Sequence, residues 1–350
     1  METKFALTLA RSGLALALLA AMPVPALADQ PGDAGGLQSD ERSEPATVST
    51  SAHPGQSLAL SPQGKNDDRL KIEVGVLPRY VSNYFEAQDE FNIGAPTTPA
   101  QSVSIVTVSG SVSYNLVQEE RKRLNAAVRV RHNIFTDLDS ANSTDVDVSL
   151  TYDARPSVIR VGYFGTRHRL VSNPGLAPVY GKTDGLSADY LHRLTKRLRG
   201  QIGYRYTRTA YPVFPDRNLS EHLFSGELRY QVQRYFMPAI GVEYSRGNAA
   251  LDSRSFKRKA VYLSVTSEIG DRVYLSLRYR HSKRDYLTVV PTDSYFGRED
   301  PRNDISGYGT VQLGGGFSLF GYFYHASNRS NQLSHRFKSD EAGLGLFYRF

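Results

Sequence analysis

From residue 69 to residue 350, apolar and polar residues alternate in a series of short segments. A period of two residues is typical of a β-strand with one apolar face, whereas a helix has a period of 3.6. The pattern predicts about fourteen strands, within a range of roughly 12 to 16. We expect these strands at residues 70–81, 102–116, 124–135, 144–152, 157–167, 182–192, 198–209, 221–232, 238–247, 257–267, 272–284, 304–313, 316–326 and 337–350.

The connections between these segments alternate in length. Short turns are expected at 118–122, 153–156, 194–197, 233–236, 268–271 and 313–315, and long loops at 86–100, 136–143, 170–181, 210–220, 248–256, 286–303 and 327–336. Short turns at one end and long loops at the other, with an even number of strands, are typical of an outer-membrane barrel. We therefore predict an all-β, antiparallel, up-and-down transmembrane barrel in a Gram-negative outer membrane, with both termini in the periplasm.

The two faces of the segments differ in chemistry. In 198–206, Ile202 and Tyr204 share one face, whereas Arg199 and Arg205 share the other. Because an Arg or Lys that faces lipid near the bilayer midplane costs about 2–4 kcal/mol, we expect the polar face to line the lumen. A soluble β-sandwich, the alternative fold, would turn its apolar face inward.

One predicted strand, 316–326, has aromatic residues on both faces. One face carries Phe317, Leu319 and Phe323, and the other carries Phe320, Tyr322 and Tyr324. Either aromatic side chains enter the lumen here or a β-bulge shifts the register.

The last strand ends on a terminal aromatic residue. Its apolar face carries Leu344, Leu346, Tyr348 and Phe350. This ending resembles the C-terminal assembly signal of outer-membrane barrels, which implies the barrel-assembly machinery and outer-membrane lipid as partners. With both termini at one end, this strand must pair with 70–81 to close the ring. Pro78 is tolerable only near the upper end of that first strand, where its missing N–H disturbs little of the pairing.

The N-terminal region predicts export. Lys4 and Arg11 precede an apolar run at 14–22, and small residues at 26 and 28 suit a signal peptidase. We assign 1–28 to a cleaved signal peptide, with a retained anchor as the alternative. Residues 29–68 are poor in apolar residues and are expected to form a disordered periplasmic tail, or alternatively a partner-binding peptide. The barrel is assigned to 69–350.

Composition removes several classes of chemistry. The chain has no Cys, which excludes disulfides, thiolate metal sites and Cys nucleophiles. Its eight His are scattered without metal-ligand spacing, and no nucleophile motif is present. We therefore predict a protein that is not an enzyme and has no metal or cofactor. The formal charge of +7 suits polyanions, but export argues against nucleic acid as a partner.

Basic residues outnumber acidic ones on the predicted inner face. The candidate substrate-guiding residues are Arg129, Arg131, Arg160, Arg199, Arg205, Arg229, Arg278 and Arg280. They either attract anionic solutes or form a ladder of ion pairs with carboxylates on neighbouring strands. For most individual residues the ladder is favoured, with Glu227–Arg205 and Glu243–Arg229 as examples that depend on the register.

Three stretches in the last third carry a family resemblance, namely 279–286 (YRHSKRDY), 298–304 (REDPRND) and 322–330 (YFYHASNRS). With the aromatic ending, they resemble the type 2 family of outer-membrane β-barrel porins that is associated with exopolysaccharide export. The resemblance implies an accessory exit channel, with polysaccharide-export components as partners. The sequence shows no helical repeat domain like the one that precedes the barrel in many polysaccharide secretins and in surface lipoprotein modifiers, which argues against an active secretion role.

Together these patterns predict a channel that conducts or exports a hydrophilic, anionic saccharide or solute. The loops 286–303 and 86–100 would act as gates, with gate residues Arg284, Asp285, Arg298, Asp300 and Arg302. Two alternatives are a general diffusion porin for small anions and a non-conducting barrel that serves in structure, assembly or adhesion.

Overall fold

The computed structural model describes residues 69–83, 102–119, 122–136, 141–170, 180–212, 214–233, 236–270 and 272–350. The predicted signal peptide at 1–28, the predicted tail at 29–68 and the predicted gating loop at 86–100 lie outside these residues.

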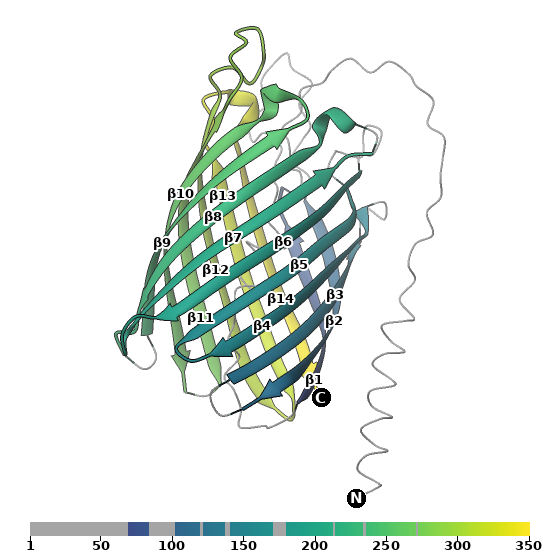
Figure 1. The fold of residues 1–350 in the computed structure, drawn as a ribbon. Coiled ribbons are helices and arrows are strands. Elements are labelled where there is room, and N and C mark those ends of the chain that lie inside the picture. The colour runs from purple at the N-terminus through teal and green to yellow at the C-terminus, as the bar shows by residue number, and fades with distance from the viewer. Residues whose placement is uncertain are drawn as a thin grey trace, which may run out of the picture. The chain divides into compact units, whose positions relative to one another are not determined.

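Fourteen antiparallel strands form one closed barrel (Figure 1). They are β1 (Leu70–Val81), β2 (Val103–Gln118), β3 (Lys122–Phe135), β4 (Ser143–Ala154), β5 (Ser157–Leu170), β6 (Tyr180–Arg193), β7 (Leu198–Ala210), β8 (Leu219–Tyr230), β9 (Phe236–Ala249), β10 (Phe256–Ile269), β11 (Val273–Tyr286), β12 (Glu299–Gly314), β13 (Phe317–Asn328) and β14 (Phe337–Arg349). Each strand pairs with its neighbours in sequence, and β1 pairs with β14. The predicted fold class and number of strands are confirmed.

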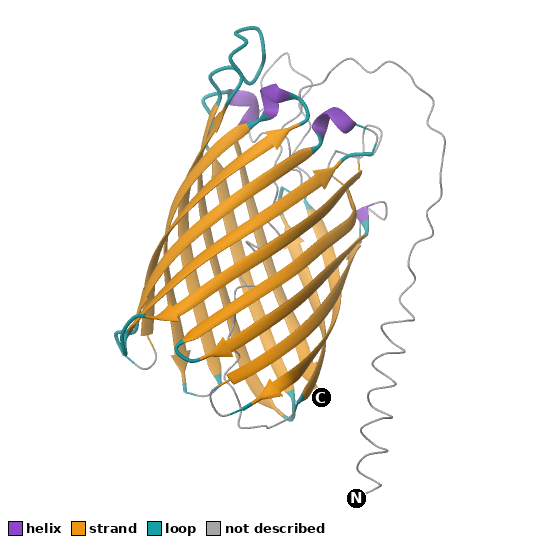
Figure 2. Ribbon diagram, viewed as in Figure 1, coloured by secondary structure: helices purple, strands orange, loops and turns teal. Residues whose placement is uncertain are grey.

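The connections give the barrel two different ends. Connections of a few residues follow the even-numbered strands, and longer ones follow the odd-numbered strands. The long connections include the helical turns η3 (Pro215–Arg217), η4 (Asp252–Arg254) and η5 (Leu333–His335), which lie together at one end in Figure 2. We call this end the long-loop end and the other the short-turn end. The C-terminus lies at the short-turn end (Figure 1).

The predicted faces are confirmed by exposure. Ile202 is 64% exposed and Leu344 is 59% exposed, and both belong to the apolar set that covers the outside. Arg129 lies opposite Asp147, and Arg160 lies opposite Asp189, on the inner face. No helix in the described part of the chain is long and apolar enough to cross a membrane.

Glycine makes the turn between β12 and β13. Gly314, Gly315 and Gly316 have φ values of 94°, 59° and 87°, a region that residues with a Cβ rarely adopt. A Cβ at Gly316 would also lie 2.4 Å from the carbonyl oxygen of Arg349. The register of β12 and β13 shifts beside this turn, between Gln312 and Gly314.

The sequence left two explanations for the aromatic residues on both faces of β13: aromatic side chains in the lumen, or a shift of register. Both features are present, but only the first explains which residues face inward. Beyond the shift, Tyr308 lies opposite Tyr322 and Thr310 lies opposite Phe320, all on the inner face. Aromatic side chains enter the lumen from β13. The irregularity only adjusts the pairing at the turn.

The start of β12 is five residues earlier than predicted. It pairs with β11 as far as Glu299 opposite Asp285. The outward positions Glu299 and Asn303 are polar, so the alternation that marks the other strands is absent here. Consequently, the gate residues Asp300 and Arg302, predicted in the loop 286–303, lie on β12. Arg284 and Asp285 lie on β11, which ends at Tyr286, two residues beyond the predicted end of that strand. Of the five predicted gate residues, Arg298 alone lies in the connection.

Candidate functional site: the barrel lumen

The eight predicted guiding arginines lie on the inner face of five strands. Arg129 and Arg131 are on β3, Arg160 is on β5, Arg199 and Arg205 are on β7, Arg229 is on β8, and Arg278 and Arg280 are on β11. The alternation of each strand turns these side chains inward, because the neighbouring positions carry the exposed apolar residues. The sequence pattern therefore placed all eight on the correct face.

A continuous ladder of ion pairs crosses the inner wall from β9 to β12. Glu243 accepts hydrogen bonds from Arg278 and Arg280 at 2.8 Å and 3.0 Å. Arg280 also lies 3.0 Å from Asp304, which is 2.8 Å from Arg302. Charge-assisted bonds in this partly desolvated setting hold the side chains against the wall.

The ladder crosses β10 because the intervening side chain is small. Ala260 lies directly opposite Glu243 and is only 6% exposed. A carboxylate on β9 can therefore reach arginines on β11 over a methyl group.

Two further predicted arginines form ion pairs outside this ladder, and two predicted pairs are wrong. Arg131 lies 3.0 Å from Asp147. Arg229 lies 2.5 Å from Glu227, two residues away on the same strand. The predicted pairs Glu227–Arg205 and Glu243–Arg229 do not form, because Glu227 is taken by Arg229 and Glu243 reaches β11 instead.

Two buried ion pairs of the inner wall were missed by the sequence reasoning. Arg79 on β1 bonds Glu341 on β14 at 3.0 Å, and Arg258 on β10 bonds Glu221 on β8 at 2.6 Å. Arg79 and Arg258 were not projected inward, although they have the parity of the inner face. Extending the same projection to every strand position would have found them.

Three of the predicted arginines have no ion pair among the described residues: Arg129, Arg160 and Arg199. Arg160 donates from Nε to the Thr151 hydroxyl at 3.2 Å. The guanidinium of Arg205 lies over the Phe164 ring, 5.7 Å from its centroid. The three arginines without an ion pair among the described residues thus lie on β3, β5 and β7.

An aromatic belt lies toward the short-turn end of the lumen. We define it as Tyr274, Tyr308, Phe320, Tyr322 and Phe347, from β11 to β14. Successive ring centroids are 5.7–6.2 Å apart, which is the normal range for aromatic pairs. The tyrosines are mostly buried in one apolar cluster that also contacts Leu77 of β1. The lumen wall is therefore charged on one part and apolar on another.

Five inner aromatic rings lie over glycines directly opposite them on a neighbouring strand. The pairs are Phe347–Gly75, Phe164–Gly185, Tyr262–Gly241, Phe256–Gly247 and Tyr322–Gly343. A Cβ on any of these glycines would lie 2.1–2.5 Å from a ring atom. The glycines thus let the rings lie flat against the wall, as in aromatic rescue of strand glycines.

At the long-loop end, the β11–β12 connection folds onto the inner wall. Arg298 and Asp300 form a buried two-point ion pair, with Nε–Oδ1 at 3.0 Å and Nη2–Oδ2 at 2.7 Å. The Arg298 guanidinium lies 4.6 Å from the Tyr286 centroid and 5.2 Å from the Tyr295 centroid. These contacts fix the base of the loop, whereas Val289 at its tip is 84% exposed.

His335 in η5 completes this loop cluster. Its ring stacks on Tyr295 with centroids 6.5 Å apart, and Asn328 Nδ2 donates to its carbonyl oxygen at 2.6 Å. Burial, followed by the nearby Arg298 charge, lowers the pKa of His335 to about 4. The ring is therefore neutral near pH 7.

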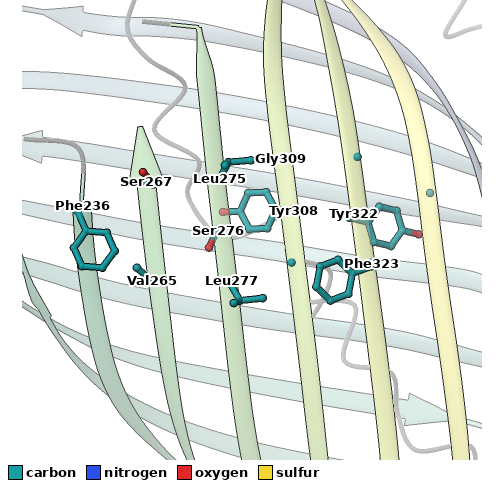
Figure 3. A pocket seen from close by; sticks show the side chains of 13 residues that line it. Phe236, Val265, Ser267, Leu275, Ser276, Leu277, Tyr308, Gly309, Tyr322 and Phe323 are labelled. Atoms are coloured by element: carbon teal, nitrogen blue, oxygen red, sulfur yellow. The ribbon is translucent and has the colours of Figure 1, made fainter. Parts of the chain in front are cut away.

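The outer wall carries an apolar groove of about 650 Å³ over β9–β14 (Figure 3). The outward side chains of Phe236, Leu277 and Phe323 border it. Its floor includes Gly307, Gly309 and Gly321, which carry no side chain. The groove belongs to the lipid-facing surface, outside the lumen.

Within the described ranges, no cluster of three or more His, Asp or Glu is arranged to hold a metal ion. The side chains that converge in the lumen are guanidinium groups, carboxylates and aromatic rings, which suit binding and guidance of a passing chain.

A closed barrel with an apolar outside and a charged lumen defines the class of outer-membrane barrel proteins. The model of the surface lipoprotein assembly modifier family matches residues 114–310, more than half of the chain. The chain belongs to this family of the Gram-negative outer membrane. No curated protein matches the sequence.

Several solved outer-membrane proteins are similar in fold at very low sequence identity. A loop-deletion mutant of OmpT, an outer membrane protein of Vibrio cholerae, is 10% identical, with a TM-score of 0.44 over 81% of this chain and 100% of that chain. The anion-selective porin of Comamonas acidovorans is 8% identical, with a TM-score of 0.41 over 80% and 98%. The channel DcaP of Acinetobacter baumannii is 11% identical, with a TM-score of 0.44 over 80% and 96%. The fold assignment rests on the strand pairing and not on these similarities.

Proposed function

We propose that this protein is a barrel that assists the delivery of lipid-anchored proteins to the cell surface. The observation that carries the proposal is the family match, which runs from Tyr114 in β2 to Thr310 in β12. That range contains the charged wall and part of the aromatic belt. A wall with both kinds of surface suits a polypeptide, which presents charged and apolar side chains in turn.

The test is surface display of lipoproteins in the source bacterium. Each lipoprotein encoded in its genome is given an epitope tag, and intact cells are probed with antibody and with external protease. Deleting the gene for this barrel is expected to reduce the display of at least one tagged lipoprotein without changing its total amount. Restoring the gene returns display. Unchanged display of every tagged lipoprotein would remove the proposal.

A second candidate is passage of an anionic solute or saccharide chain, including an exopolysaccharide. The three arginines without an ion pair among the described residues, Arg129, Arg160 and Arg199, favour it, because basic side chains that are not held in an ion pair can turn toward an anion in the lumen. In planar bilayers the triple Gln variant is expected to lose anion selectivity. Arg278→Gln is the matched control, since Arg278 is a ladder member. Absence of current from the purified barrel, even after removal of residues 288–297, would exclude this candidate.

A further inference from the structure

The barrel closes through a seam that is less completely paired than any other. The register of β1 and β14 contains seven directly opposed positions, and every other neighbouring pair contains at least eleven. Pairing stops after Val76–Leu346 and resumes at Arg79–Gly343. Since the spacing on both strands is equal, the register does not shift. Two positions on each strand simply lack a paired partner across the seam.

Proline and glycine account for this gap. Pro78 has no N–H to donate, and it lies within the gap and not at the end of the pairing. The expectation that its missing N–H would disturb little of the seam is therefore wrong. Gly345 faces the gap from β14, where a Cβ would lie 2.6 Å from the Val76 carbonyl oxygen. The Leu77 side chain lies against Gly345, since its Cδ1 would be 2.9 Å from the same Cβ, so the gap is filled by an apolar contact and not by a hydrogen bond.

The two ends of the seam are fastened differently. Toward the long-loop end, Arg79 and Glu341 form a buried ion pair at 3.0 Å. Beyond it, Ser82 and Asn83 make four hydrogen bonds of 2.8–3.0 Å with residues 338–340. Toward the short-turn end, four opposed positions run from Glu73–Arg349 to Val76–Leu346. The more exposed Glu73–Arg349 ion pair at 3.0 Å and a bond from the Phe350 N–H to the Ile72 carbonyl add to this pairing. The buried ion pair and the side-chain hydrogen bonds thus lie on the long-loop side of the gap, whereas the short-turn side has backbone pairing and one more exposed ion pair.

The lumen beside the gap is apolar, unlike the rest of the charged wall. Leu77 faces inward from the gap and packs on the cluster of Tyr274, Tyr308 and Tyr322. Phe347 lies next to it over Gly75. On the other side of the seam, Val76 and Leu346 are each 47% exposed on the lipid-facing surface. An apolar inner surface and an apolar outer surface thus meet at the seam that is interrupted.

From this juxtaposition we infer that the seam between β1 and β14 opens laterally to pass the acyl chains of a lipid-modified polypeptide between lumen and bilayer. The inference rests on the proposed function, because it assigns the route by which a lipid anchor travels. Acyl chains are more stable in hydrocarbon than beside a charged wall, whereas a polar polypeptide has the opposite preference. If the seam opens beside the aromatic belt, the acyl chains can stay in hydrocarbon while the polypeptide stays in the polar lumen.

Lateral opening is tested first without any client protein. The chain has no Cys, so each introduced thiol is unique. Leu77→Cys places a thiol in the lumen at the gap, and Ser264→Cys places one in the lumen at a fully paired position. The probe is a phosphatidylcholine with a thiol-reactive group at the end of one acyl chain, in proteoliposomes that contain the folded barrel.

We expect the thiol of the Leu77→Cys variant to react at least about tenfold faster than that of the Ser264→Cys control, because the rate scales with the population of the open state. Adding Pro78→Ala, which restores an N–H, is expected to slow this reaction. That each variant is still a folded barrel is checked by comparing its gel mobility before and after heating. Equal rates at both thiols, in barrels that pass this check, would overturn the inference.

The route is then tested by locking the seam. Val76→Cys with Leu346→Cys joins directly opposed outward residues of β1 and β14, and Val242→Cys with Val261→Cys joins their counterparts on β9 and β10. Oxidation of the seam pair is expected to stop display of the tagged lipoprotein, and reduction to restore it, with no effect in the control pair. Normal display with the seam locked would overturn the route and leave the proposed function intact. A wild-type barrel that displays no lipoprotein would instead remove the proposed function, while the labelling result still decides whether the seam opens.

Discussion

The pairing of an aromatic ring with a glycine is the repeated residue-level device of the inner wall. In all five pairs the two residues are directly opposed, so the ring has only the backbone of the next strand beneath it. Removal of one side chain makes room for another. The consequence is that bulky residues cover the wall without projecting across the lumen.

Gly241→Ala tests this device. Its Cβ would lie 2.1 Å from the Tyr262 ring, so we expect the free energy of unfolding to fall by about 1–3 kcal/mol through overpacking. Urea unfolding in lipid vesicles measures this loss. Gly226→Ala is the control, since its Cβ would meet Val242 at an ordinary 3.9 Å. In a chain that already carries Tyr262→Ala, the same Gly241→Ala change should cost little, because the ring that it meets is absent. Equal losses in both glycine variants of the wild-type chain would contradict the argument.

His335 predicts a pH dependence of the loop cluster. Its folded-state pKa of about 4 lies below the unfolded value of 6.5, so the unfolded loop binds the proton more readily. The stabilising contribution is fully present above pH 6.5 and is lost as the pH falls toward 4, by about 3 kcal/mol in all. The hydrogen-exchange rates of residues 329–336, corrected for intrinsic rates, should rise as the pH falls from 6.5 toward 4.

The matched comparison for this prediction is another histidine of the same end. His335→Gln should remove the dependence on pH, whereas His325→Gln should keep it, because His325 bonds Asp340 and is not part of the loop cluster. If the exchange rates of the His335→Gln variant still depend on pH, other titratable groups cause the dependence.

At the level of strands, the ladder connects elements that are not neighbours. Glu243 on β9 binds Arg278 and Arg280 on β11. The ladder therefore links β9 to β11 across β10, whereas backbone pairing links only adjacent strands. Glu243→Gln should therefore lower the free energy of unfolding by about 3 kcal/mol, since it leaves Arg278 without its ion pair and Arg280 with Asp304 alone.

Arg278→Gln should cost less than Glu243→Gln, because Glu243 then keeps Arg280 and the Arg278 side chain is 35% exposed. Urea unfolding of the two variants gives the order. If Arg278→Gln costs as much as Glu243→Gln, the ladder does not act through a shared carboxylate.

At the level of the whole molecule, the last strand closes the ring. Phe350 donates its N–H to the Ile72 carbonyl at 2.9 Å, and its ring lies 4.7 Å from that of Tyr348. Deleting Phe350 is expected to reduce the amount of barrel in the outer-membrane fraction, because the deletion removes the end of the predicted assembly signal. The same truncated chain, refolded in vitro, should still form a barrel, which is recognised by a gel mobility before heating that differs from its mobility after heating. Normal assembly in cells would contradict the role assigned to this residue.

The sequence alone determined the number of strands, their faces and their order around the barrel. Alternation with a period of two marks each strand, and a charge is too costly to face lipid, so Ile202 outward and Arg205 inward follow from residue type. The same rule failed at Glu299–Asn303, where the strand continues with polar outward residues and the local signal disappears.

Only the tertiary structure decided which residues meet. Whether Glu243 binds Arg229 or Arg280, whether Tyr262 covers a glycine, and whether Pro78 interrupts the seam all depend on the register between strands that are distant in the chain. Register is set jointly by turns, packing and ring closure, and a shift of one residue would reverse every face. The charged wall was therefore readable from the sequence, whereas the ion-pair ladder, the aromatic belt and the incomplete seam required the closed barrel.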